Sequence, residues 1–164
     1  MTKIVFILSV LFLTGCNQPV KIIQNYPDGN IKSEGILLMG KKDGGAKLYY
    51  PNGKIKEEGN WRKDKKIGIW TFYYETGELY ARINFKDDLQ EGPTIYYYQN
   101  GQVAEKSYWL SSKANGLSEA FYDNGKKKSI SNWKNNLKEG EVLNYDSLGR
   151  LKNKELWKDG KLMQ

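Results

Sequence analysis

The sequence has one cysteine, Cys16, and no histidine among its 164 residues. A disulfide within the chain is therefore impossible, and zinc sites built from cysteine and histidine are excluded. The lack of histidine also removes the usual catalytic triads and cysteine–histidine pairs. One kind of chemistry stays open to a lone thiol, because its thiolate is a good nucleophile for alkylation.

The carboxylates do not form a convincing acid/base pair. Glu57 and Glu58 are neighbours on an expected strand, so they face opposite ways, and Asp87 and Asp88 fall in an expected loop. The sequence also lacks a phosphate-binding glycine loop and the regularly spaced aspartates of a calcium loop. We therefore expect no catalytic residue, no metal site and no cofactor.

The first sixteen residues have the features of an export signal. Lys3 precedes an apolar run from Ile4 to Leu13, which is shorter than the roughly 20 residues that a membrane-spanning helix needs and is typical of a secretory signal peptide. The segment Leu13-Thr14-Gly15-Cys16 resembles the lipobox of bacterial lipoproteins. That resemblance implies cleavage before Cys16 and a diacylglyceryl group on its thiol. The alternative is an ordinary signal peptide with a chance cysteine.

The lipobox divides the chain into a signal peptide (1–15), a lipidated N-terminus with a short tether (16–25) and a repeat array (26–164). Two or more acyl chains hold a protein stably on a membrane. Asn17 follows the cysteine, whereas an aspartate there is associated with inner-membrane retention in some bacterial lipoproteins. We therefore expect the outer membrane where the cell has one, and otherwise the outer face of the cytoplasmic membrane.

The rest of the chain repeats with a period of 24 residues. Two glycine series share this period: Gly29, Gly53, Gly77, Gly101, Gly125 and Gly149; and Gly44, Gly68, Gly92, Gly116 and Gly140. Aromatic columns run in phase with them: Trp61, Phe85, Trp109, Trp133 and Trp157, with Leu37 in the first repeat; Tyr26, Tyr50, Tyr74, Tyr98 and Tyr122, with Asp146 in the last. A fixed period of this length indicates a repeat architecture.

Each repeat is predicted to form a β-hairpin. Asn52-Gly53 predicts a tight turn in which both central residues have positive φ, and it precedes a strand of about residues 54–61, a polar loop and a second strand of about 68–74. Even spacing places Ile55 and Trp61 on one face. No segment has a helical apolar period. The fold expected is all-β: an elongated, single-layer antiparallel sheet of about six 24-residue hairpin repeats, with about twelve strands.

Residues 50–59 and 66–73 resemble the MORN-variant repeat, and bacterial members of that family are often labelled antitoxin-like. The resemblance extends over residues 26–160, and the first and last repeats depart from it at Leu37 and Asp146. It implies a hairpin array that binds proteins or lipids and has no common catalytic residue. An antitoxin role against a cytoplasmic toxin fits poorly with an export signal.

Two sets of side chains are candidates for binding or for structure. The loops within the repeats would form a basic edge for an anionic surface or partner, or else a set of solvated charges: Lys41, Lys42, Arg62, Lys63, Lys65, Lys66, Lys86, Lys113, Lys134, Lys138, Lys158 and Lys161. The repeated aromatics are interpreted as cross-strand scaffold rather than as a binding ladder: Tyr50, Trp61, Tyr74, Phe85, Tyr98, Trp109, Tyr122, Trp133 and Trp157.

The favoured hypothesis is a membrane-anchored extracytoplasmic module that binds a protein partner or a membrane surface. The alternatives are a lipoprotein that binds glycan or peptidoglycan through aromatic columns, an antitoxin or immunity-type protein, and, least favoured, an enzyme. Membrane contact is expected through the lipid anchor. The net charge of +7 draws a protein to anionic partners, but export makes nucleic acid an unexpected one, and no small-molecule cofactor is expected.

Overall fold

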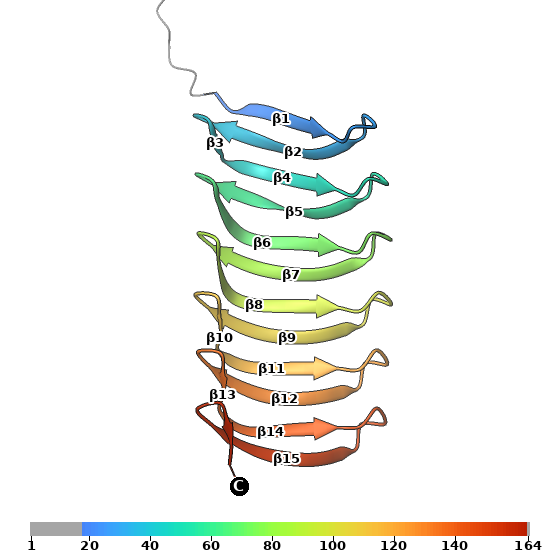
Figure 1. Cartoon of the computed structure of the whole chain (residues 1–164), viewed down its shortest axis with the longest axis vertical. Helices are drawn as coiled ribbons and strands as arrows, with labels where there is room; N and C mark the ends of the chain where they lie inside the picture. The colour runs from blue at the N-terminus through green and yellow to red at the C-terminus, as the bar shows by residue number, and fades with distance from the viewer. Residues whose placement is uncertain (1–17, 164) are drawn as a thin grey trace, which may run out of the picture.

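A computed structural model of the chain describes residues 18–163. These residues form one antiparallel sheet of 16 strands, which Figure 1 shows as an elongated ladder. Within this part of the chain there is no helix long and apolar enough to cross a membrane. The predicted signal peptide and Cys16 lie outside the described residues, so the structure neither supports nor contradicts either prediction.

The strands follow the chain in order. They are β1 (Val20–Asn25), β2 (Ile31–Leu38), β3 (Lys41–Lys42), β4 (Gly44–Tyr49), β5 (Ile55–Arg62), β6 (Lys65–Tyr73), β7 (Leu79–Lys86), β8 (Leu89–Tyr97), β9 (Val103–Leu110), β10 (Lys113–Ala114), β11 (Gly116–Phe121), β12 (Lys127–Lys134), β13 (Leu137–Lys138), β14 (Gly140–Tyr145), β15 (Leu151–Lys158) and β16 (Lys161–Leu162). Twelve of them have six or more residues, and the other four, β3, β10, β13 and β16, have two.

Neighbours in the sheet are neighbours in sequence, and six hairpins stack along the long axis: β1–β2, β4–β5, β6–β7, β8–β9, β11–β12 and β14–β15. Every pairing is therefore local, as expected for a repeat array. The all-β, single-sheet prediction is confirmed, and the six hairpins supply the twelve longer strands.

The turn at Asn52-Gly53 differs from the predicted type. Gly53 has a φ of 80°, but Asn52 is not among the residues with positive φ. The amide of Gly53 donates to the Tyr50 carbonyl at 2.9 Å, and the amide of Tyr50 donates to the Lys54 carbonyl at 2.8 Å. This pattern is a type I turn followed by a left-handed glycine. Pro51 favours it, because its fixed φ suits the first central position of a type I turn.

A bulge beside this turn makes the predicted Ile55–Trp61 face wrong. Leu48 pairs with Glu57, but the next residue, Tyr49, pairs with Ile55, so one extra residue lies on β5. Directly opposed residues share a face and consecutive strand residues alternate. Ile55 therefore lies on the side of Tyr49, and Trp61 lies on the side of Glu57. Even spacing fails as a guide wherever a bulge shifts the register.

Two-residue turns with positive φ at both positions do occur, at the opposite edge of the sheet. Lys63 and Asp64 have φ values of 49° and 67°, and Asp87 and Asp88 have values of 51° and 70°. The expected polar loops are thus tight turns, and the strands beside them extend further than predicted. Successive turns are tied together, since the amide of Asp64 donates to the Lys42 carbonyl at 2.9 Å and the amide of Asp88 to the Lys66 carbonyl at 3.1 Å.

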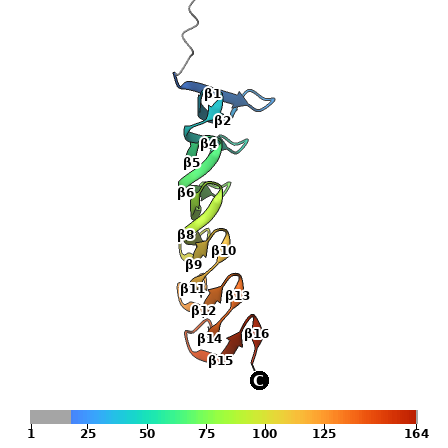
Figure 2. The ribbon, with the colours of Figure 1, turned by 90° about the vertical axis from the view of Figure 1, so that its left-hand side faces the viewer.

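The second glycine series marks a corner in every hairpin after the first. Glu58 pairs with Thr71, whereas Asn60 pairs with Ile67. Gly59, the single residue between them on β5, therefore lies opposite three residues of β6, of which Gly68 is the first. Gly68 has a φ of 66°, which side-chain-bearing residues rarely adopt. Beyond such corners, β10, β13 and β16 lie to one side of the longer strands (Figure 2). The hairpin ends thus bend over one face.

That bent-over face, here called the inner face, holds the small core. Pairing across successive strands places Trp70 beside Ile83 and Ala81 beside Tyr96 on this face. Within residues 18–163, the buried side chains lie on it: Trp70, Ala81, Ile83, Thr94, Ser107, Ser131 and Val142. The outer face carries Glu34, Glu58 and Thr71, and no outer-face residue in the described chain is fully buried.

Tyrosine hydroxyls join each repeat to the next. The Tyr50 hydroxyl donates to the Tyr73 carbonyl at 2.8 Å, and four equivalent bonds run from Tyr26 to Tyr49, Tyr74 to Tyr97, Tyr98 to Phe121 and Tyr122 to Tyr145. Asp146 takes the place of tyrosine in the sixth repeat. Its carboxylate caps its own turn by accepting from the Leu148 and Arg150 amides at 3.0 and 2.9 Å.

β1 lies inside the segment that we expected to be a tether. It pairs with β2 over its whole length, from Val20 opposite Leu37 to Asn25 opposite Ile31. It occupies the place in the first hairpin that β4 occupies in the second. The repeat array therefore already includes Val20–Asn25, which corrects the predicted boundary at residue 26.

Candidate functional site

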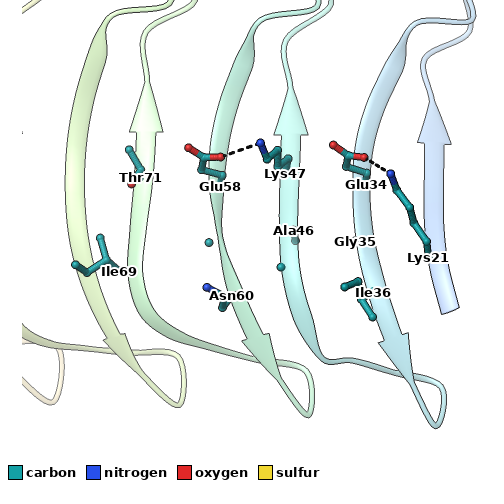
Figure 3. A pocket seen from close by; sticks show the side chains of 12 residues that line it. Lys21, Glu34, Gly35, Ile36, Ala46, Lys47, Glu58, Asn60, Ile69 and Thr71 are labelled. Carbon is teal, nitrogen blue, oxygen red and sulfur yellow. Dashed lines mark ion pairs between the residues drawn. The ribbon is translucent and has the colours of Figure 1, made fainter. Parts of the chain in front are cut away.

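The outer face of the first three hairpins contains a shallow depression of about 570 Å³. Figure 3 shows two ion pairs side by side within it, from Lys21 Nζ to Glu34 Oε2 at 2.8 Å and from Lys47 Nζ to Glu58 Oε2 at 3.3 Å. Ile36 and Ile69 lie toward the other end. Gly45 has no side chain on this face, which leaves space open beside Asn60.

Hydrogen bonds hold these carboxylates in their charged form. The bond from the Lys21 ammonium, with a second from the Tyr49 hydroxyl, lowers the pKa of Glu34. The same Glu34 contact raises the pKa of Tyr49 to about 12. The Tyr73 hydroxyl donates to Glu58 Oε1 at 2.7 Å and lowers the pKa of that carboxyl. A general acid must still hold its proton near neutral pH, which requires a raised pKa. The pKa values of Glu34 and Glu58 are lowered instead, so neither carboxyl suits that role.

The described residues contain no cluster of three or more acidic, cysteine or histidine side chains that could hold a metal ion. The carboxylates that sequence analysis weighed as pairs have separate partners. Glu57 lies 3.3 Å from Lys66 Nζ, whereas Glu58 pairs with Lys47. Asp88 accepts from the Lys66 amide at 2.8 Å, whereas Asp87 lies 3.5 Å from the Arg62 guanidinium. These groups act as ties between strands and turns.

A second outer-face feature, here called the outer patch, covers the third to fifth hairpins. Its residues are Arg82, Pro93, Ile95, Lys106, Tyr108 and Leu117, which face one another across β7, β8, β9 and β11. Tyr108 is 50% exposed and Leu117 is 51% exposed. No ion pair within residues 18–163 involves Arg82 or Lys106. The patch thus combines an apolar centre with two cations that form no ion pair in this range. Glu119 lies opposite Lys106 but is paired with Lys127 at 2.8 Å.

The predicted basic edge is divided between two locations. Nine of its residues are exposed at the two-residue turns or next to them: Lys41, Arg62, Lys63, Lys65, Lys86, Lys113, Lys134, Lys158 and Lys161. The other three lie over inner-face rings. Lys66 Nζ is 3.9 Å from the Trp70 ring centre, Lys42 Nζ is 4.5 Å from that of Trp61, and Lys138 Nζ is 4.6 Å from that of Trp157. These three engage aromatic faces.

Acidic side chains at the same edge are bound to backbone amides. Asp64 accepts from the Lys42 amide at 2.8 Å, and Asp43 accepts from the Lys63 amide at 3.3 Å. Asp87 lies 3.5 Å from the guanidinium of Arg62. The edge is therefore a mixed row of charges that links one turn to the next.

The repeated aromatics occupy two positions. Trp61, Phe85, Trp109, Trp133 and Trp157 lie on the inner face near the two-residue turns. Tyr50, Tyr74, Tyr98 and Tyr122 lie at the opposite edge and donate the hydrogen bonds described above. The Trp61 and Trp70 rings meet edge to face, with centres 5.2 Å apart. Trp70 is not one of the repeated aromatics, because the corresponding positions of other repeats hold Ala46, Thr94, Ser118 and Val142.

The inner face has a depression of about 410 Å³ where that column is small and polar. Ser107, Ser118 and Ser131 line its floor, and Trp109 and Trp133 form its sides. Sequence analysis did not single out these serines. The sequence does contain a signal for them: Ser107 occupies the repeat position of Gly59, and Ser118 occupies that of Trp70.

A sequence model for the MORN repeat variant matches the chain in four segments, 42–63, 66–87, 90–110 and 114–135. Together these segments cover more than half of the 164 residues. The chain belongs to the MORN repeat variant family. No curated protein matches the sequence.

The matched MORN segments show where the family unit begins. The segment 42–63 contains β4, the turn at Asn52-Gly53 and β5, so the tight turn lies in the middle of the unit. The hairpins β1–β2 and β14–β15 have the same pairing but lie outside the matched segments. Those are the two repeats that sequence analysis found to be atypical, as terminal repeats often are.

Proposed function

We propose that this MORN repeat protein is a bacterial lipoprotein of the cell envelope that binds a protein partner through its outer patch. The lipid on Cys16 holds the array at the membrane, in the outer membrane where one exists. The sheet then presents a long, fixed surface. In this proposal the protein has no catalytic role, and the antitoxin-like label is only a family name.

The observation that carries this proposal is the composition of the outer patch. Tyr108 and Leu117 are large, half-exposed and adjacent, while the acidic groups Glu34 and Glu58 elsewhere on the same face are paired with lysines. Exposed apolar clusters with a polar rim are typical of interaction sites. Tyrosine is also enriched among the residues that dominate binding energy.

The charges of the outer patch indicate the chemistry of the partner. Arg82 and Lys106 lie on either side of Ile95 in one cross-strand row. A partner with an apolar centre and carboxylates at its rim would match them, and complementary charges of this kind favour association and orientation.

The anchor is tested by Cys16→Ser. We expect the variant to stay unprocessed, or to be exported without a lipid and released from membranes by a carbonate wash. The lipid adds about 0.8 kcal/mol for each buried methylene, so its loss should remove stable membrane binding. Processing before residue 16 together with carbonate-resistant binding in the variant would show that another feature anchors the chain.

The outer patch is tested by Tyr108→Ser combined with Leu117→Ser. Cross-linking and pull-down of the acylated protein from its own membranes should yield a partner with the wild-type chain. Recovery of the same partner should fall about tenfold or more with the double variant, because truncating a central tyrosine removes much of the binding energy. Both residues are half-exposed, so we expect little change in the unfolding midpoint.

Leu156→Ser is the matched control. Leu156 is 57% exposed and lies on the outer face of β15, away from the patch. It should leave partner recovery unchanged. Equal losses with Leu156→Ser and with the double variant, or no loss with either, would contradict the assignment of the outer patch.

A further inference from the structure

The inner face changes character along the array. Between the second and third hairpins, Trp70 of β6 fills the space over Gly59 of β5, and both residues are tightly packed. Two repeats later, Ser118 and Ser107 occupy the corresponding positions. Two short side chains replace an indole ring and leave the depression of about 410 Å³. The fold of the repeat is kept, so the space is a local feature of its sequence.

Buried hydroxyl groups fix the aromatic walls of this depression. The Trp109 indole Nε1 donates to Ser107 Oγ at 3.1 Å, and the Trp133 Nε1 donates to Ser131 Oγ at 3.0 Å. Ser107 is 8% exposed and Ser131 is 7% exposed. Each of these hydroxyls accepts from an indole and retains a hydrogen of its own to donate. The rings are therefore preorganised, and polar groups remain available below them.

A second depression, of about 580 Å³, adjoins the first on the same face. It shares Glu105, Trp109 and Ala120 with the first and adds tyrosine rings. The Tyr80 ring centre lies 5.7 Å from that of Tyr96 and 5.1 Å from that of Tyr74. We call the two depressions together the inner groove. It runs across several strands, from tyrosine rings at one end to Trp133 at the other.

The groups that line the inner groove suit an uncharged, hydroxyl-rich ligand. Aromatic rings offer flat apolar faces, while Ser118, Ser129, Asn144 and the Glu105 carboxylate offer short-range hydrogen bonds. Sites for small ligands typically combine aromatic walls with a few such polar groups. The backbone groups beneath are already paired within the sheet, so an extended peptide cannot add to them as a strand.

Charge argues against an anionic ligand. Lys138 lies over the Trp157 ring, 4.6 Å from its centre, and Lys128 lies near the Tyr122 ring at 5.8 Å. Both line the groove with their ammonium groups directed at aromatic rings, and the Glu105 carboxylate lines the part that the two depressions share. Phosphate and carboxylate ligands are normally held by clustered arginine or lysine side chains.

We propose that the inner groove binds a neutral oligosaccharide, with sugar rings on Trp109, Trp133 and the tyrosines and sugar hydroxyls on the serines and Glu105. By strand register, the serine and tryptophan side chains of this site point to the opposite face from those of Tyr108 and Leu117, whose positions also border the groove. The proposal does not depend on the proposed partner. A lipid-anchored array with both sites would hold a glycan and a protein at the same time.

The test uses the full chain in detergent micelles and two uncharged β-1,4-linked probes, chitotetraose and cellotetraose. Calorimetry and tryptophan fluorescence should detect binding of at least one probe below about 1 mM. The affinity should stay unchanged between about 0.1 and about 0.5 M NaCl, because a neutral ligand is not screened. Ser118→Leu, which fills the groove, should weaken binding by about tenfold or more.

Asn132→Leu is the control, because Asn132 is exposed on the outer face between two groove residues of the same strand. Its affinity for the probes should equal that of the wild type. Circular dichroism establishes that each variant is folded. No binding of either probe by the wild type at about 10 mM, equal binding by Ser118→Leu, or binding that salt abolishes would each overturn the proposal.

Discussion

Replacing Trp70 with alanine should lower the free energy of unfolding by about 3–5 kcal/mol, the range found when a buried tryptophan is truncated. Trp70 is fully buried in a sheet with little other core. The variant loses the edge-to-face contact with Trp61, whose ring centre is 5.2 Å away, and the 3.1 Å hydrogen bond from Nε1 to the Asn60 carbonyl. Urea unfolding followed by circular dichroism measures the loss.

Trp157→Ala provides the comparison. Trp157 is half-buried in the last long strand, and its Nε1 donates to Glu155 Oε2 at 2.8 Å. Fewer atoms surround it, so truncation leaves less of a cavity, and we expect about 1 kcal/mol or less. Equal destabilisation by the two variants would show that the core is not concentrated around Trp70.

Adding a single methyl group at Gly59 should destabilise the array by about 1–3 kcal/mol, which is typical of overpacking. A Cβ atom at this position would lie 2.6 Å from Cγ of Trp70 and closer still to its Cδ2. Gly59 does not have a positive φ, so the backbone itself accepts alanine. The expected loss therefore comes from the clash alone, and thermal and urea unfolding of Gly59→Ala would measure it.

Two variants separate this clash from a general preference for glycine. Gly45→Ala places a Cβ no closer than 3.7 Å to Asn60 Oδ1, so its stability should stay within about 0.5 kcal/mol of the wild type. Combining Gly59→Ala with Trp70→Leu should cost less than the sum of the two single changes, since the shortened side chain leaves room for the methyl group. Strict additivity would contradict direct packing between the two residues.

The fold could be predicted because the period fixes it. Glycines, turn residues and aromatics recur together every 24 residues, and local hairpins that stack in order are the simplest arrangement with such a period. The same period predicts that the glycine turns line up along one edge of the sheet and the polar loops along the other. It needed no long-range contact, because every strand pairs with a sequence neighbour.

The errors have local physical causes. The extra residue on β5 reverses the face of Ile55, and hydrophobic alternation does not reveal such a bulge. The Asn-Gly pair was compatible with two turn types. The same turn forms at all three Asn-Gly pairs, whether or not a proline precedes them, and in each the asparagine side chain accepts from the amide two residues on. β1 was assigned to the tether because it precedes the first Tyr-Pro turn, whereas its position in the sheet depends on pairing with β2.

The binding surfaces were less predictable than the scaffold. The sequence drew attention to repeated lysines, yet Lys42, Lys66 and Lys138 lie over aromatic rings of the inner face. The outer patch and the inner groove arise where repeats differ, as with Tyr108 or Ser118. Finding them needs the register of neighbouring strands, because side chains far apart in sequence meet only across the ladder.

The most direct test of the proposed function is photo-cross-linking from two positions on the outer face. A photoreactive amino acid in place of Tyr108 should join the acylated protein to one partner of defined mass in its own membranes. The same group in place of Leu156, which is on the same face and 57% exposed, should not. A single adduct at 108 alone is the result that the outer patch predicts. Equal adducts at both positions, or none at 108, would contradict it.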